Sequence, residues 1–134
     1  MFLFTNKLDG KTDTEICNCE FIHRNEGMVD YSSFMPDSGD LVIRNSRIGC
    51  SVHIHGKARI DSSEFCSSHQ AIKLYSGSEL IAQNITLQLA EGATSANSGI
   101  AMESNTKLNI DKLDIDPGYA YTISGNGDAV LKKC

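Results

Sequence analysis

Five copies of one six-residue pattern recur along the chain and constrain its fold more than any other feature. Each copy begins with an aliphatic residue, continues with four mostly polar residues and ends with a second apolar residue. The copies span Ile16–Phe21, Ile43–Ile48, Ile60–Phe65, Leu80–Ile85 and Leu108–Leu113. Successive copies begin 27, 17, 20 and 28 residues apart. Repeats of about 20 residues predict a solenoid, because units this short bury an apolar face only by stacking on their neighbours.

Apolar and polar residues alternate around each copy, and this period of two is typical of β-strands rather than helices. Near the third copy, the expected inward residues are Val52, Ile54, Ala58 and Ile60. Asn18, Asn45 and Ser62 each stand two residues after the first aliphatic residue of their copy. Asn tolerates the left-handed backbone conformation, so this position predicts a bend. The sequence therefore predicts an all-β chain of strand–bend–strand units.

These units resemble the turns of right-handed parallel β-helices of the pectate-lyase-like superfamily. The resemblance covers residues 38–131, with a weaker turn near residues 10–21. It implies a short right-handed parallel β-helix of about five to six turns, stacked about 4.8 Å apart. We expect a single domain over residues 1–134, with an N-terminal cap, first turn and loop in 1–37, the main turns in 38–131 and a tail in 132–134. We also expect capped ends, because open strand edges promote polymerisation, and the candidate caps are Met1–Leu8 and Gly127–Cys134.

Composition narrows the class of protein. The chain is 40% hydrophobic and 22% charged, which is typical of a folded domain. Its longest apolar runs are far shorter than the ~20 residues of a membrane-spanning helix, and no secretory signal is evident at the N-terminus. We therefore expect a soluble protein in the cytoplasm of the producing or host cell, without a membrane association.

The charges and cysteines indicate which ligands to expect. The net charge is −5, and two acidic ends flank a middle, residues 40–75, with five Lys or Arg against three acids. Nucleic-acid binding needs a dense basic stripe, so we do not expect it. The five cysteines lack the spacing of a metal site. His53 and His55 have the spacing of a metal pair in a strand, but only Cys50 and His69 are near enough to complete it. We expect no metal and no cofactor.

A group of outward residues on neighbouring units is the candidate functional surface. It consists of His53, His55, Arg59, Lys73, Tyr75 and Glu103. Stacking places His53 beside Lys73 and His55 beside Tyr75, with Glu103 one turn further on. These groups suit general acid–base chemistry or protein recognition. The sequence indicates no nucleophile and no oxyanion hole, so we expect recognition.

A long insertion between the first two copies is a second candidate for binding. Residues 22–37 carry Tyr31, Phe34 and Met35, which we expect to make loop contacts with a partner. A shorter insertion, residues 89–98, is small and polar.

The most economical hypothesis is a non-enzymatic protein-binding module. A domain this small suits an adaptor, or an inhibitor of a host or bacterial protein complex such as phages and pathogens encode. One alternative is a carbohydrate-binding or polysaccharide-cleaving module, although the chain has no Trp and only four Tyr to form aromatic platforms. A second alternative is a self-assembling scaffold that resembles bactofilin filaments in architecture. A homodimer, through a strand edge or through the His/Tyr surface, also remains open.

Overall fold

The computed structural model describes residues 3–6, 14–21, 33–36, 40–67, 70–90, 93 and 95–132, and side chains within 15–20, 40–67, 70–90, 93 and 95–132. These residues form strands and turns, and none of them is helical. The strands are β1 (Leu3–Asn6), β2 (Thr14–Cys17), β3 (Glu20–Phe21), β4 (Ser33–Pro36), β5 (Leu41–Arg44), β6 (Arg47–Ile48), β7 (Ser51–Ile54), β8 (Lys57–Ser67), β9 (Ile72–Leu74), β10 (Glu79–Leu89), β11 (Ala96–Met102), β12 (Lys107–Ile115), β13 (Tyr119–Gly125) and β14 (Asp128–Lys132). The part of the chain that the structure describes contains no helix long and apolar enough to cross a membrane.

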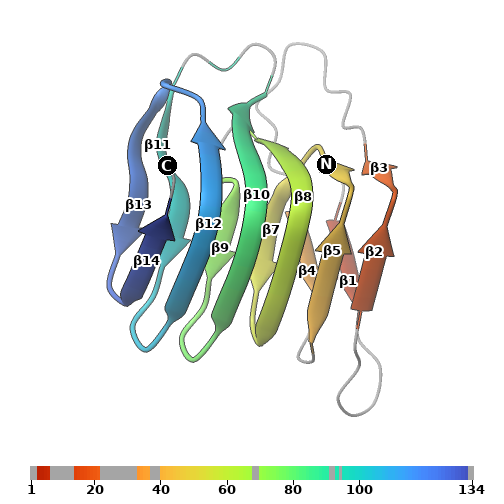
Figure 1. The fold of residues 1–134 in the computed structure, drawn as a ribbon, viewed down its shortest axis with the longest axis horizontal. Helices are drawn as coiled ribbons and strands as arrows, with labels where there is room; N and C mark the ends of the chain where they lie inside the picture. The colour runs from red at the N-terminus through yellow and green to blue at the C-terminus, as the bar shows by residue number, and fades with distance from the viewer. Residues whose placement is uncertain are drawn as a thin grey trace.

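The strands lie in two parallel sheets, so the predicted all-β class is confirmed. One sheet has the order β1-β4-β7-β9-β11-β13, and the other has the order β14-β12-β10-β8-β5-β2, with β3 and β6 pairing beside this path. The chain passes from the first sheet to the second and back throughout, as the steady progression of colour in Figure 1 shows. Each pass adds one strand to each sheet next to the strand of the preceding pass. This arrangement brings residues about 20 positions apart side by side.

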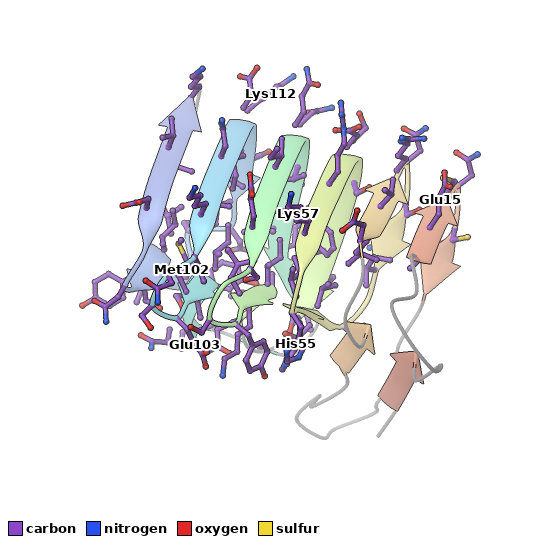
Figure 2. All side chains as sticks on the ribbon, turned by 90° about the horizontal axis from the view of Figure 1, so that it is seen from below. Glu15, His55, Lys57, Met102, Glu103 and Lys112 are labelled. Atoms are coloured by element: carbon purple, nitrogen blue, oxygen red, sulfur yellow. The ribbon has the colours of Figure 1, made fainter. Side chains whose placement is uncertain are left out.

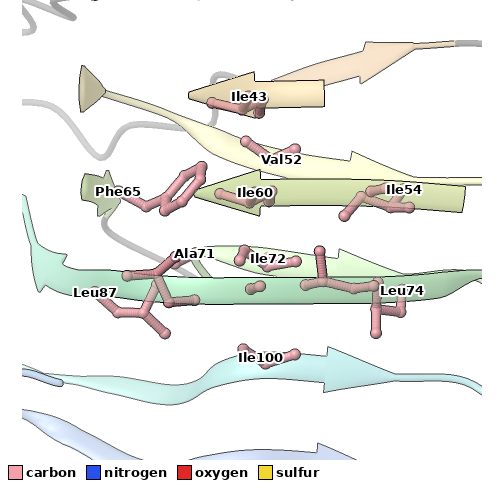
Figure 3. Packing of buried hydrophobic residues seen from close by; sticks show 14 of the residues in the cluster. Ile43, Val52, Ile54, Ile60, Phe65, Ala71, Ile72, Leu74, Leu87 and Ile100 are labelled. Atoms are coloured by element: carbon pink, nitrogen blue, oxygen red, sulfur yellow. The ribbon is translucent and has the colours of Figure 1, made fainter. Parts of the chain in front are cut away.

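The core lies between the two sheets and consists of the inward residues of both. In β8, buried and accessible residues alternate over most of the strand, and Ile60 and Phe65 are 0% exposed. From the other sheet, Ile72 and Ile100, also 0% exposed, face them (Figure 3). Strand side chains point alternately to the two faces, so the period-two pattern determines burial on each side of the bend at Ser62, where the alternation is interrupted.

A column of left-handed residues divides the second sheet into two arms. The residues with positive φ in this column are Asn18, Asn45, Ser62, Asn84 and Lys112. Their neighbours are paired in register, as with Asp61 beside Gln83, so the bends stack on one another. The bend predicted at the first three positions is confirmed, and the backbone is left-handed at each of them. The last two occupy the same position but were missed by the sequence analysis.

Buried serines follow two of these bends and join neighbouring passes. Ser46 and Ser63 are each 5% exposed. The backbone N–H of Cys19 donates to Ser46 Oγ over 3.1 Å, and the N–H of Ser46 donates to Ser63 Oγ over 3.2 Å. The hydroxyls therefore accept hydrogen bonds from backbone groups that the bend removes from the regular ladder, as buried N–H groups require.

The register of the last two copies of the repeat differs from the prediction by two residues. The repeat pattern aligned Leu80 with Ile60, but Leu80 pairs with Ala58, and Ala82 takes the place beside Ile60. Ile110 continues that column in β12. A shift of two residues keeps every side chain on its original face. The hydrophobic pattern was therefore right about burial and wrong about alignment.

The two terminal segments continue the sheets instead of covering them. Residues 3–6, within the first candidate cap, form β1, which pairs with β4. Residues 128–132, within the second candidate cap, form β14, which pairs with β12. Lys132, expected in a tail, therefore belongs to a strand, because Ala129 and Leu131 extend the apolar alternation by one more pass. Gly127 lies in the bend before β14, and the remaining residues of both segments lie outside the described part.

The expected loop of residues 22–37 also contains a strand. Phe34 and Met35 lie in β4, where Phe34 is paired with Phe4 and with Val52. Tyr31 lies outside the described residues. Phe34 and Met35 therefore belong to a strand and not to a loop. Their side chains are not among those described, so contact with a partner stays a prediction.

Candidate functional site

The candidate site lies where the chain leaves the first sheet for the second. His55, Tyr75 and Glu103 directly follow the buried ends of β7, β9 and β11. The N–H of Tyr75 donates to the carbonyl of Ile54 over 3.0 Å, and the N–H of Glu103 donates to that of Leu74 over 2.9 Å. These bonds stack the three residues along one edge. Figure 2 shows His55 and Glu103 on this edge and Lys112 on the opposite one.

Tyr75 is the centre of this group, which we call the His–Tyr corner: His53, His55, Lys73, Tyr75 and Glu103. The Tyr75 ring stacks on the His55 ring, with centroids 4.0 Å apart and planes 12° apart. His53 Nδ1 lies 2.8 Å from the Tyr75 hydroxyl. The Lys73 ammonium lies 4.8 Å from the ring centroid, within cation–π range. Two neighbouring passes thus hold one aromatic ring in a defined orientation.

The predicted neighbours within the corner are confirmed. His53 and Lys73 are paired in register between β7 and β9, and the rings of His55 and Tyr75 are in contact. Glu103 lies one pass further on, where its Oε2 accepts a hydrogen bond from the backbone N–H of Ser76 over 2.9 Å. This bond holds the carboxylate against the turn that follows Tyr75.

The protonation of His53 is strongly perturbed. Burial, the positive charge of Lys73 and the neighbouring His55 together lower its pKa from 6.5 to about 4, and burial is the largest of these causes. His53 is therefore neutral at neutral pH. A neutral imidazole can accept a hydrogen bond from the Tyr75 hydroxyl, or donate one to it in the other tautomer.

Arg59 does not belong to this corner. It lies in β8, in the other sheet, and its Nε is 3.4 Å from Asp61 Oδ2. Its side chain is 62% exposed, so this ion pair contributes little to stability. The sequence placed Arg59 on the same outward face because it alternates correctly with Ile60. The turn at Gly56 transfers the chain from one sheet to the other. The alternation of apolar and polar residues continues through this turn, so it does not reveal the change of sheet.

A polar groove along the left-handed column is the feature that the sequence analysis missed. It has a volume of about 730 Å³ and is lined by Asn18, Cys19, Glu20, Asn45, Ser46, Arg47, Ser62, Ser63, Glu64, Asn84 and Thr86. Arg47 spans it, with 3.6 Å to Glu20 and 3.5 Å to Glu64. The charged groups at its centre therefore already have partners. The recurring Asn at the bend was the signal that could have located the groove.

Among the residues that the structure describes, no group of three or more His, Cys, Asp or Glu side chains is placed to hold a metal ion. Cys50 is buried in the core. His69, the other residue considered as a third ligand for His53 and His55, lies outside the described part of the chain.

Comparisons with protein-family models, with curated proteins and with solved structures give no match to this chain.

Proposed function

We propose that the chain is a non-enzymatic protein-binding module and that its two sheets form a short right-handed parallel β-helix. Three observations support the fold. Successive passes of the chain alternate between two parallel sheets. Each strand of the second sheet pairs in parallel with the strand of the preceding pass. Left-handed residues recur at the same position of these passes. Coaxial turns with aligned bends are typical of solenoids of this class. A high-resolution structure with an open, uncoiled pair of sheets would contradict this part of the proposal.

The arrangement around Tyr75 is the observation that carries the binding function. Tyr, with its large and rigid amphipathic surface, is enriched at the energetic centres of protein interfaces. Here its ring is oriented by His55, its hydroxyl by His53, and its face is approached by Lys73. Side chains that are already ordered lose less conformational entropy on binding, which favours affinity. A module that only binds acts as an adaptor or an inhibitor by occupying its partner's surface.

Carbohydrate binding is less well supported by the same geometry. A sugar-binding tyrosine presents a ring face to the ligand, whereas the stacked imidazole of His55 already covers one face of Tyr75. The Lys73 ammonium over the ring restricts access further. A protein partner, which can contact the edge and the hydroxyl of Tyr75 together with the neighbouring charges, fits this surface better.

Affinity capture with matched variants tests the proposal. The tagged wild-type chain, Tyr75→Ala and Ile81→Ala are used as baits in parallel, and captured proteins are quantified by mass spectrometry. Ile81 is the control because it is a large apolar residue, 50% exposed, in the other sheet. We expect a protein that binds wild type and Ile81→Ala equally and Tyr75→Ala at least about tenfold less. Equal capture by all three baits would show that the corner is not the binding surface.

A further inference from the structure

The C-terminal end of the sheets exposes residues that occupy core positions. Leu131 is paired with Ile110, and Ala129 with Leu108. Ile110 is 0% exposed and Leu108 is 3% exposed, whereas Leu131 is 37% exposed. The same inward positions become accessible because, in the described part of the chain, β14 is the terminal strand of its sheet. The shared interior is therefore open at this end.

Other exposed apolar residues gather at the same end. Val130, on the outward face of β14, is 49% exposed. Tyr121 of β13, the terminal strand of the first sheet, is 61% exposed, although its register partner Ser98 is 0% exposed. A terminal strand with accessible apolar residues favours the addition of another strand.

We infer that this end binds a second copy of the chain, through antiparallel pairing of β14 with β14 of the copy about a two-fold axis at Val130. Directly opposite residues of an antiparallel pair point to the same face. Val130 then lies opposite Val130 of the second copy, and Leu131 lies opposite Ala129, so that a large and a small inward residue meet. The two interiors become continuous, and the exposed apolar positions are covered.

Charge complementarity on the outward face supports this partner. Lys57, Glu79, Lys107 and Asp128 form one register column, in which the sign of the charge alternates at every strand. In the antiparallel pair, the next residue in that column is Lys132 of the second copy. The alternation therefore continues across the interface, with opposite charges directly opposite one another. By symmetry, Asp128 of the copy lies opposite Lys132.

Head-to-tail stacking, which would place β14 against β2 of another copy, fits less well. Leu131 lies in the same register column as Ile16. If that column continued into the next copy, Leu131 would lie opposite Ile16 and Val130 opposite Glu15. An exposed apolar residue would then meet a carboxylate. Such a heterologous contact repeats from copy to copy and produces filaments, whereas the two-fold pair uses the β14 end of both copies and closes on itself. The structure favours a closed dimer.

Sedimentation velocity of the full chain, from about 1 to about 100 μM, tests the inference over the range in which weak dimers dissociate. We expect a monomer–dimer equilibrium. Val130→Lys places two like charges opposite each other at the axis and is expected to weaken dimerisation about tenfold or more. Ile81→Lys is the matched control, since Ile81, Asn109 and Val130 share one column and Ile81 is 50% exposed. It should dimerise like wild type.

A disulfide cross-link tests the dimer without relying on Val130→Lys, which could lose the dimer simply by misfolding. Val130→Cys should form a disulfide-linked dimer with itself on mild oxidation, above the background of the wild-type chain with its five cysteines, and Ile81→Cys should not. A wild-type chain that remains monomeric throughout the concentration range would overturn the inference. So would polymers of increasing length, or a dimer that Val130→Lys leaves intact. None of these results affects the capture of a partner through Tyr75, so either proposal can be refuted without refuting the other.

Discussion

Asn84 adopts a left-handed backbone conformation, with φ of 55°, at the bend of β10. This conformation costs a residue with a Cβ about 1–2 kcal/mol. The cost is smaller for Asn, because its side chain can hydrogen-bond the nearby backbone. Val is disfavoured most strongly, since its branched Cβ crowds the backbone. Asn84 is exposed, so little packing is lost on substitution. We expect Asn84→Val to lower the free energy of unfolding by about 1–2 kcal/mol.

The neighbouring residue supplies the control. Gln83 is exposed, lies in the same strand and pairs with Asp61 and Asp111. Val is favoured at extended positions, so Gln83→Val should be neutral or slightly stabilising. The converse change is Lys112→Asn. Lys112 has φ of 68° at the equivalent bend, and we expect the substitution to raise the free energy of unfolding by about 0.5–1 kcal/mol.

Urea denaturation of the four proteins measures these differences from the midpoint and slope of each transition. Thermal unfolding should show a parallel shift of roughly 4 °C for each kcal/mol in a chain of this size. The reasoning would be refuted if Asn84→Val were no less stable than Gln83→Val, because the stacked left-handed bends would then not exist in solution.

Three further predictions concern protonation, glycine geometry and packing. The folded pKa of His53 is lowered to about 4, below its ordinary 6.5, so the unfolded chain binds the proton first. Stability should therefore fall as pH decreases from about 6.5 towards 4, and urea titrations at several pH values should show a smaller fall for His53→Gln. A Cβ on Gly125 would clash with the Met102 carbonyl oxygen, whereas one on Gly77 meets nothing within 4 Å, and both have positive φ. Gly77→Ala should cost about 1 kcal/mol and Gly125→Ala clearly more; equal midpoints would contradict the close approach. Phe65→Ala, at a 0% exposed position, should cost about 3–5 kcal/mol in the same assay, and a loss below 1 kcal/mol would show that the core is not packed as described.

Much of the architecture was predictable because burial in strands follows a simple period. The alternation around Val52 and Ile54 predicted the inward face of β7, and stacking predicted that His53 would lie beside Lys73 and His55 beside Tyr75. The spacing from the aliphatic residue to Asn45 predicted the left-handed bend. These are local or nearest-neighbour properties, and the residues themselves carry the signal.

The sequence by itself determined which residues of the main repeats are inward and which residue types occupy the first bends. Only the tertiary structure decided how the strands align. A period of two is unchanged by a shift of two residues, so the pattern could not distinguish Leu80 from Ala82 as the neighbour of Ile60. Backbone pairing along the whole of β8 and β10 fixed that choice, and it placed Lys112 at a bend. The same limit applies to Arg59, since alternation continues through a turn that transfers the chain from one sheet to the other.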